Sequence, residues 1–426
     1  MTRRHRVRGS VLLALAVGCA HRARGGADAV APAAVYLVIV DGLGADAATA
    51  ERMPRLADAV RDGGSWLVAT AAMPTRTNPN HASLLTGAQP AAHGITGNWY
   101  WTGIAERELG EPALLEVETL FTAIERQRPA LTTVAAFAKA KLRHLFGAAP
   151  GRQTGPDVSW RPAEDDIYAA RDEETMAGFR SLVQAHEPAF AVVALADVDG
   201  AGHRDGPGTA SYWAAVGNAD RLIGKLLDDL EAAGRWNRSV VLVTADHGFM
   251  ALRAAPGDQI ASAALAAGGA HVVADGGIAH VYAGAAGSLE GTIAAARRHA
   301  GIAAVYARLP RADVPGVPAD WHVDHPRMGD LLLVARPGFT FVGGPQDPTR
   351  RFRGNHGGPG ERRIPLVVVG GHPALSRAPS GARPSVADIA PTIARLLGMA
   401  PPRRFDGAPL APAEGGHVLD ELLGGE

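Results

Sequence analysis

The sequence predicts an α/β fold with a mostly parallel central sheet flanked by helices on both faces, and with a small inserted α+β subdomain. Continuous apolar runs of strand length alternate with stretches of helical periodicity, the pattern of buried parallel strands joined by helices. Aspartates closely follow three of these runs, as expected where ligand-binding residues gather at the carboxyl ends of parallel strands. With 426 residues, 47% hydrophobic and 20% charged, the chain is long enough for one large domain carrying an insert.

The N-terminal segment differs in composition from the rest of the chain. Several arginines precede an apolar stretch at 11–17 that is too short to span a membrane, so residues 1–19 are predicted to be a signal peptide. Its end resembles a bacterial lipobox in which Cys19 is lipidated, and a plain secretory signal is the alternative. Residues 20–34, rich in Ala and Gly, are predicted to form a flexible tether. We therefore expect an exported protein, periplasmic or lipid-anchored at the bacterial envelope.

Four apolar runs are predicted to be buried strands, at residues 35–40, 190–195, 240–244 and 365–369. Between the second and third runs, residues 211–234 have apolar side chains at helical spacing, and Gly234 is suited to end that helix. A last helix is expected from Ser385, whose hydroxyl can cap it, to Gly398. Asp388 favours its N-terminus because a carboxylate stabilises the positive end of a helix.

Residues 251–343 interrupt this pattern with short strand and helix units of their own, at 278–282, 289–299 and 302–307. We interpret this stretch as an inserted cap subdomain that shapes the rim of the site. Residues 35–250 and 344–426 would then form the catalytic domain.

Candidate metal ligands lie at or just after the carboxyl ends of the predicted strands or on connecting segments: Asp41, Asp199, His203, Asp246, His247 and His356. Six carboxylates and imidazoles divide into two sets of three, and this mixture suits zinc. The hydroxyl of Thr77 completes one set. The chain therefore predicts two divalent ions, most simply zinc. Its only cysteine lies in the leader, so the site uses no thiolate.

Each of these motifs has a second interpretation when taken alone. Asp41 after an apolar run is also typical of a turn or a helix cap. Residues 199–203 are predicted to form a glycine-loosened loop in which Asp199 and His203 could chelate one ion, and a solvated polar loop is the alternative. His356 in a glycine-rich stretch is similarly ambiguous. The adjacent residues 246–247 can serve one ion only where the backbone turns, and Gly248 permits such a turn. The prediction depends on the conjunction of the motifs.

A longer series of motifs runs through the chain in this order: Asp41, Thr77 to His81, Thr86-Gly87, His93-Gly94, Asn98, Asp199 with His203, Thr244 to Gly248, and His356-Gly357. This series resembles the alkaline phosphatase superfamily, and within it the type I phosphodiesterase/nucleotide pyrophosphatase branch. The likeness extends from about Tyr36 to Leu397. It implies an alkaline phosphatase-like fold.

The resemblance also implies roles for single residues. One zinc would be held by Asp41, Thr77, Asp246 and His247, and the other by Asp199, His203 and His356. Asn98 would donate a hydrogen bond to a phosphoryl oxygen. A threonine hydroxyl is nearly inert at neutral pH, but coordination to a cation would activate Thr77 for attack on phosphorus, giving a phosphothreonine intermediate. Thr75 and Ser83 are interpreted as loop and helix residues.

Three functions remain open at this stage. The first is hydrolysis of phosphodiesters, with nucleotide pyrophosphate bonds as one option. The second is hydrolysis of phosphonoacetate, other phosphonates or phosphomonoesters, because residues 134–143 resemble the lysine-bearing segment of phosphonoacetate hydrolase. In that reaction Lys139 and Lys141 would pair with a substrate carboxylate or terminal phosphate. The alternative is that both lysines lie on a solvated helix face. The third is a non-catalytic surface lipoprotein. A sulfatase is disfavoured because it requires cysteine or serine at Thr77.

The sequence gives weaker indications about partners. Trp99 follows Asn98 and would either stack on a flat leaving group or pack against the inserted subdomain. A net charge of −1 with scattered Lys and Arg predicts no binding of polymeric nucleic acid. We expect a small phosphorylated substrate and contact with a membrane only through an anchor at Cys19. No motif defines an oligomeric state.

Overall fold

The computed structural model of the chain describes residues 34–163, 169–253, 258–284, 289–343, 352–376 and 382–423. The predicted signal peptide, Cys19 and nearly all of the predicted tether lie outside the described residues. The exception is Ala34, which begins the first strand and so does not belong to a tether. Residues 32–426 form one compact unit. In the described ranges no helix combines the length and apolarity needed to cross a membrane.

The central sheet has seven strands in the order β2-β19-β10-β1-β9-β5-β8. Their bounds are β1 (Ala34–Val40), β2 (Ser65–Thr70), β5 (Thr133–Phe137), β8 (Val158–Trp160), β9 (Phe190–Leu195), β10 (Ser239–Thr244) and β19 (Arg363–Val369). The strands from β10 to β8 pair in parallel, whereas β19 runs antiparallel to both β10 and β2. The prediction of a mostly parallel sheet is confirmed.

The middle strands are buried along their whole length. Every residue of β9 and β10 is buried, and in β1 only Ala34 is partly exposed. Valine, isoleucine and leucine dominate these strands because both faces of the sheet are covered by helices. Burial on two faces explains why the apolar runs in the sequence are continuous rather than alternating.

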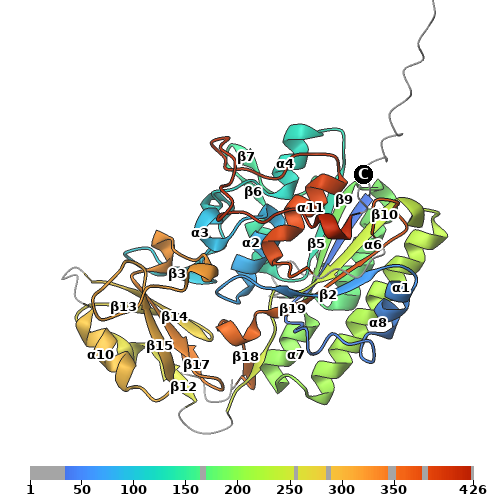
Figure 1. Ribbon diagram of the computed structural model, residues 1–426. Coiled ribbons are helices and arrows are strands. Elements are labelled where there is room, and N and C mark those ends of the chain that lie inside the picture. Colours follow the sequence, from blue (N-terminus) through green and yellow to red (C-terminus); the bar gives the residue numbers. More distant parts are fainter. Residues whose placement is uncertain are drawn as a thin grey trace, which may run out of the picture. The chain divides into compact units, whose positions relative to one another are not determined.

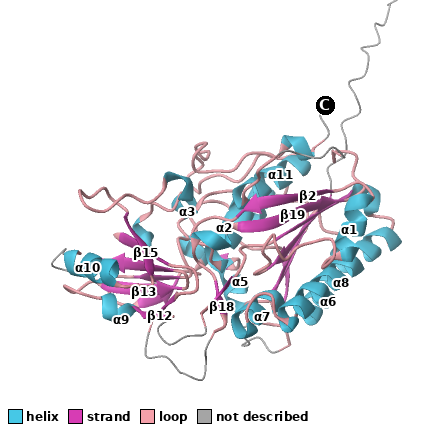
Figure 2. Cartoon of the chain, turned by 60° about the horizontal axis from the view of Figure 1, so that its bottom comes forward, coloured by secondary structure: helices cyan, strands magenta, loops and turns pink. Residues whose placement is uncertain are grey.

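Helices cover both faces of the sheet (Figures 1 and 2). One layer contains α1 (Pro54–Arg61), α6 (Asp172–His186) and α8 (Ala210–Ala232), with α6 packed on β5 and β9. The other contains α2 (Thr77–Thr86), α5 (Ala140–Leu145) and α11 (Ile389–Leu396). The chain also forms the short elements α3 (Pro90–His93), α4 (Leu120–Gln127), α7 (Asp197–Asp205), β6 (Ala148–Ala149), β7 (Arg152–Gln153), β11 (Met250–Ala251) and β18 (Gly354–Asn355). The hairpin of β3 (Trp99–Trp101) and β4 (Glu106–Glu108) packs through β3 on the second sheet, described below.

Two of the predicted helix signals act as expected. Ser385 and Asp388 form a capping box in which the Ser385 N–H donates to Asp388 Oδ2 at 2.7 Å, and the chain enters α11 through a 3₁₀ turn, Val386–Asp388. Gly398, just after this helix, has a left-handed φ of 65° that favours glycine. These local contacts fix where the last helix begins and ends.

A second sheet lies within the stretch predicted as an insert. It has the antiparallel order β13-β14-β16-β15, with β13 (His271–Asp275), β14 (Ile278–Tyr282), β15 (Ile302–Ala307) and β16 (Leu331–Ala335). Beside it lie α9 (Ser262–Leu265), α10 (Glu290–Arg298), β12 (Gln259–Ala261) and β17 (Thr340–Val342). These elements share a hydrophobic cluster separate from that of the central sheet. The division into a catalytic domain and a cap subdomain itself stays a prediction.

Candidate metal centre

Asp41 and Asp246 follow two adjacent strands of the central sheet. Since β1 and β10 are parallel and in register, both side chains emerge at the same edge. The Gly42 N–H donates to Asp246 Oδ1 at 3.1 Å, which ties the two strand ends together. Gly42 has a φ of +81°, and a Cβ there would lie 2.7 Å from the Phe249 ring, so only glycine fits this turn. Both carboxylates are buried.

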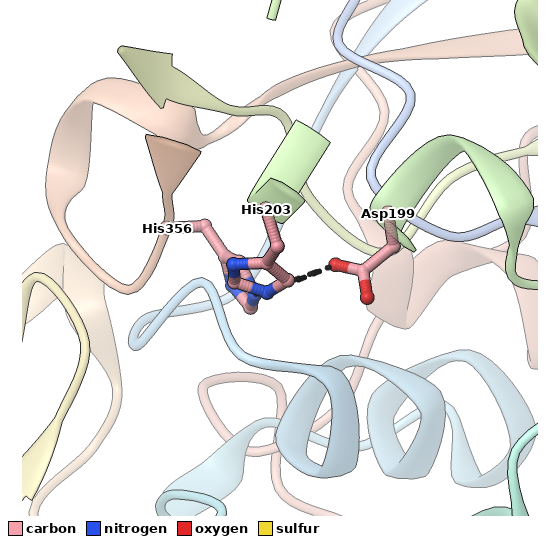
Figure 3. Close-up of side chains that lie close together, drawn as sticks. All are labelled: Asp199, His203 and His356. Carbon is pink, nitrogen blue, oxygen red and sulfur yellow. Dashed lines mark hydrogen bonds and ion pairs between the residues drawn. The ribbon is translucent and has the colours of Figure 1, made fainter. Parts of the chain in front are cut away.

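Asp199 and His203 lie on α7, a helix that follows β9, so the prediction of a loosened loop is wrong. In a helix, residues four apart share a face, and His203 Nε2 therefore lies 3.4 Å from Asp199 Oδ1 (Figure 3). One of the two glycines inside the motif, Gly202, is required by close packing. A Cβ at Gly202 would approach the Phe249 ring to 2.8 Å.

His356 completes the first set of ligands from the segment after β18. Its Nε2 lies 3.2 Å from His203 Nε2 and 3.6 Å from Asp199 Oδ1, so the two rings face the same carboxylate (Figure 3). Ligand atoms of these three residues all lie within 4.8 Å of one another. That spacing suits three ligands of one cation.

The second set lies directly beside the first. His247 Nε2 is 3.2 Å from Asp246 Oδ2 and 3.5 Å from Asp41 Oδ1, and its ring stacks on that of His356 with centroids 3.5 Å apart. Asp41, Asp199 and His247 also have ligand atoms within 4.8 Å of one another. The predicted turn at Gly248 is not a left-handed one. This glycine instead allows close approach to Gly44, whose Cα would lie 3.2 Å from an added Cβ.

His81 is a member of the cluster that the sequence analysis did not assign. It forms a third group with Asp41 and Asp246, and its Nδ1 lies 3.5 Å from Asp246 Oδ2. His81 is on α2, four residues after Thr77, and its Nδ1 is 3.0 Å from the Thr77 carbonyl oxygen. The helical spacing from Thr77 was the signal that could have found it.

All four imidazoles are held in the same way. Each Nδ1 lies at hydrogen-bond distance from a backbone carbonyl: His203 from Gly354 (3.1 Å), His247 from Gly248 (3.1 Å), His356 from Thr75 (2.7 Å) and His81 from Thr77 (3.0 Å). A carbonyl only accepts, so Nδ1 carries the proton and Nε2 keeps its lone pair. This is how proteins orient histidine toward a metal ion.

Several buried atoms at the centre make no hydrogen bond to the described residues: Asp41 Oδ1, Asp199 Oδ1, Asp246 Oδ2, His81 Nε2 and His247 Nε2. A buried polar atom without a hydrogen-bond partner lowers the stability of the fold, so a group of such atoms indicates a place where an ion or ligand binds. Carboxylate oxygens and imidazole nitrogens are ligands for zinc and related divalent ions. The residues present therefore fit divalent cations.

Burial sets the charge of these ligands. It lowers the pKa of His247 to about 4 and that of His356 well below its usual value, so both rings are neutral, as metal ligation requires. Burial raises the pKa of Asp199, but the Lys139 ammonium group, 2.7 Å from Asp199 Oδ2, opposes this effect, and the pKa lies below its ordinary value. For Asp41, burial and then the Asp246 carboxylate raise the pKa well above the ordinary value. Additional positive charge at the centre would therefore stabilise the ionised form of these closely spaced carboxylates.

The two lysines are buried, so the alternative of a solvated helix face is wrong. Lys139 precedes α5, and its Nζ lies 2.7 Å from both Asp41 Oδ2 and Asp199 Oδ2. Lys141 is 9% exposed; burial, and then repulsion from Lys139, lowers its pKa to about 8. They reach this edge because β5, which we did not predict, is the neighbour of β9.

Thr77 and Asn98 lie together at the start of α2. Thr77 is the first residue of the helix and is 1% exposed. Asn98 Oδ1 accepts the Asn78 N–H at 2.9 Å, which leaves its Nδ2 group as the donor. Thr75 lies in a loop and donates to the Gly358 carbonyl at 2.7 Å, whereas Ser83 lies within α2. The predicted loop and helix settings of these two hydroxyls are confirmed.

Two tryptophans after Asn98 differ in their surroundings, and a contact of Trp99 with the substrate stays a prediction. Trp101 packs against the second sheet, where its ring stacks on His271 with centroids 3.7 Å apart. Trp99 is 40% exposed. Phe352, which the sequence analysis did not consider, is 50% exposed and its ring lies 5.1 Å from that of His203.

The fold and the clustered side chains define an α/β protein with buried Asp/His clusters, at the carboxyl edge of its sheet, that could hold metal ions. The chain belongs to the family described as type I phosphodiesterase / nucleotide pyrophosphatase, whose model matches residues 35–359. The resemblance drawn from the motifs is confirmed.

Curated relatives match part of the chain. Ectonucleotide pyrophosphatase/phosphodiesterase family member 3 of Mus musculus is 25% identical over 184 residues, which are 41% of this chain and 20% of that protein. Bis(5'-adenosyl)-triphosphatase of Homo sapiens is 25% identical over 229 residues, which are 51% of this chain and 48% of the relative. The chain thus spans less than half the length of these relatives.

Solved structures share the fold across nearly all of the chain. An inactive variant of murine ectonucleotide pyrophosphatase / phosphodiesterase 5 in complex with AMP has a TM-score of 0.73 at 20% identity, covering 92% of this chain and 100% of that one. Phosphonoacetate hydrolase from Sinorhizobium meliloti in complex with phosphonoformate has a TM-score of 0.62 at 22% identity, covering 86% and 95%. The predicted alkaline phosphatase-like fold is confirmed.

Proposed function

We propose that this protein hydrolyses phosphodiester bonds of small phosphorylated substrates, nucleotide pyrophosphates among them, with two divalent ions, most simply zinc. The observation that carries the proposal is the set of buried, unpaired carboxylate and imidazole atoms at one sheet edge, which the structure places next to each other. Family membership supports the same class of reaction.

The proposed ligand division is the one that the resemblance implies, and its first set coincides with one of the three clusters found among the described residues. Asp199, His203 and His356 hold one ion; Asp41, Thr77, Asp246 and His247 hold the other. When bound, the ions neutralise charge on the phosphoryl group and lower the pKa of the threonine hydroxyl. The neutral, Nδ1-anchored imidazoles support this assignment because they present only Nε2 to the centre.

Thr77 is the proposed nucleophile. Its Oγ1 attacks phosphorus, the bond from phosphorus to the leaving oxygen breaks, and a phosphothreonine forms. Water then attacks the same phosphorus and releases the threonine oxygen. Asn98 Nδ2 donates to a non-bridging oxygen, while the Asn78 N–H keeps the amide oriented. The N-terminal end of α2 adds a favourable dipole for the anionic group.

An exposed aromatic side chain beside His203, and a second that follows Asn98 in the sequence, favour a diester over a monoester. A diester needs room for its second substituent, and Phe352 beside His203 and Trp99 after Asn98 are both partly exposed. Flat or apolar leaving groups can stack on such rings. We assign Trp99 and Phe352 to this outer part of the site.

The second candidate is a phosphonate or phosphomonoester hydrolase, and the burial of Lys139 and Lys141 at the centre favours it. In that reaction the ammonium groups would pair with a substrate carboxylate or terminal phosphate. Lys139, however, already pairs with Asp41 and Asp199. We therefore rank this function below diester hydrolysis.

A substrate panel tests the proposal. Initial rates are compared for bis(p-nitrophenyl) phosphate, p-nitrophenyl phosphate, a nucleoside triphosphate and phosphonoacetate, with wild-type protein and Thr77→Ala. We expect the diester to be hydrolysed fastest, the rate to vanish with a chelator and return with zinc, and Thr77→Ala to lose about 10³-fold or more in kcat. Preference for phosphonoacetate would support the second function, and no turnover of any compound would support the non-catalytic lipoprotein.

Export is part of the same proposal. The predicted leader and lipobox support a protein anchored through Cys19 at the bacterial envelope or released into the periplasm. Metabolic labelling with a fatty acid distinguishes these: an anchored protein incorporates label, and Cys19→Ser abolishes incorporation.

A further inference from the structure

One turn of the second sheet reaches into the candidate metal centre. This turn, residues 275–278, joins β13 to β14. Its first residue, Asp275, has a fully buried side chain whose two oxygens have different partners. Oδ1 forms an ion pair with Arg76 Nε at 2.8 Å, and Oδ2 accepts the Asn98 N–H at 2.7 Å. Arg76 immediately precedes Thr77, so a single carboxylate holds both segments that carry the proposed chemistry.

The turn can pack closely against Arg76 and His356 because it has glycine at the points of contact. Gly276 has a φ of +72°, and a Cβ there would lie 2.2 Å from the His356 carbonyl oxygen and 2.6 Å from Arg76 Nη1. A Cβ at Gly97, beside Asn98, would lie 2.7 Å from Asp275 Oδ2. The Gly277 N–H donates to the His356 carbonyl at 2.9 Å. The turn is therefore packed directly against a proposed metal ligand.

Arg76 links the same turn to His356 by a second route. Its Nη1 donates to the His356 carbonyl oxygen at 3.1 Å and to Asn355 Oδ1 at 3.3 Å. The Arg76 side chain is only 12% exposed, so the orientation of its guanidinium group depends on the protein groups that accept its hydrogen bonds. Without the Asp275 carboxylate, this cation would lose its anionic partner beside the nucleophile.

We propose that Asp275 is a positioning residue for the reaction at Thr77. From the inserted stretch of the chain, it fixes the backbone of Asn98 and the guanidinium of Arg76, and thereby the orientation of the phosphoryl-binding amide toward Thr77. The second sheet thus supports the reacting groups directly rather than only forming a rim. This inference rests on the proposed function of Thr77 and Asn98.

The test compares Asp275→Asn with a matched control in wild-type background. Asparagine keeps the size and one oxygen acceptor but removes the charge that holds Arg76. Asp330→Asn is the control, because Asp330 also accepts a backbone N–H (Ala283, 2.8 Å) and lies near an arginine (Arg308, 3.9 Å) without touching the centre. Each variant is assayed on bis(p-nitrophenyl) phosphate, with zinc content and melting temperature measured in parallel.

We expect Asp275→Asn to lower kcat about 10- to 100-fold with KM changed less than about threefold, because displacing Asn98 weakens contacts made in the transition state. Zinc content should stay at the wild-type value. The effects of Asp275→Asn and Arg76→Gln on kcat should be non-additive in the double variant, since both substitutions remove the same ion pair. A kcat within twofold of Asp330→Asn, or full additivity, overturns the proposal.

Failure of the proposed function gives a different result. If the wild-type protein hydrolyses no diester, then orthovanadate, which mimics the transferring phosphoryl group, is titrated calorimetrically into zinc-loaded wild type, Asp275→Asn and Asp330→Asn. A vanadate affinity lowered at least fivefold only in Asp275→Asn supports the positioning role. Equal affinities in all three overturn it.

Discussion

Lys139 Nζ lies 2.7 Å from Asp199 Oδ2 in a fully enclosed position, with the Asp41 carboxylate at the same distance. The Lys139 ammonium group therefore lies between two carboxylates that belong to different proposed ion sites. This contact offsets part of the negative charge of the centre, and it makes Lys139 a competitor of divalent ions for the same oxygens.

Lys139→Met should destabilise the metal-free protein and increase the gain in stability on adding zinc. Removing one partner of a buried charge cluster leaves the others unpaired, which costs about 3 kcal/mol of unfolding free energy. Urea denaturation with chelator and with excess zinc measures both quantities. Lys225→Met, on the exposed face of α8, is the control and should change neither. An unchanged metal-free stability would contradict the account.

His81→Asn should weaken metal binding about 10- to 100-fold, as expected for loss of a group that directly adjoins a ligating carboxylate. The reason is that His81 Nδ1 lies 3.5 Å from Asp246 Oδ2 and anchors on the Thr77 carbonyl. Competition with a fluorescent zinc chelator gives the affinity. His144→Gln, an exposed histidine paired with Glu111, should leave it unchanged. Equal affinities in both variants would exclude a role for His81.

Stability should fall with rising pH because of Asp172. Burial, and then repulsion from Asp197, raises its pKa from 3.8 to about 7. The folded state binds this proton more tightly than the unfolded state, so the stabilising contribution is complete below pH ~4 and is lost as the pH rises through about 7.

Asp172→Asn cannot ionise and should be more stable than wild type by about 2 kcal/mol at pH 8, with the difference shrinking toward pH ~4. Denaturant unfolding at several pH values measures this, with the exposed Asp62→Asn as control. A difference that does not depend on pH would show that Asp172 is already ionised in the folded protein.

Phe352→Ala should raise KM for an aryl diester by about tenfold and leave the KM for dimethyl phosphate within twofold. An exposed ring that stacks on a flat group contributes about 0.5–1.5 kcal/mol, and a methyl group cannot make this contact. The comparison variant is Leu309→Ala, which removes another exposed apolar side chain. Equal effects on both substrates would argue against a leaving-group contact.

Much of the fold could be predicted because strands that are buried on both faces appear in the sequence as continuous apolar runs. The runs at β1, β9 and β10 are continuous and apolar, and each is followed by an aspartate at the carboxyl edge. The helical form of Asp199 to His203 was missed because two glycines disfavour a helix locally. Packing against Phe249, a tertiary contact, decides in favour of the helix.

Other parts of the site depend on contacts that sequence spacing does not encode. β5 is only five residues long and leads directly into the Ala- and Lys-containing segment before α5, so neither its end nor the burial of Lys139 could be foreseen. Asp275 lies 199 positions after Arg76 and 177 after Asn98, and only the folded hairpin brings them together. Such residues carry no local signal of their own.

The central claim is that two divalent ions are held side by side next to Thr77. Anomalous diffraction at the zinc absorption edge, from crystals of zinc-loaded protein, tests it directly. We predict two peaks, one within bonding distance of Asp199, His203 and His356 and the other within bonding distance of Asp41, Asp246 and His247. An absence of zinc peaks among these side chains, or zinc bound only elsewhere on the protein, would contradict it.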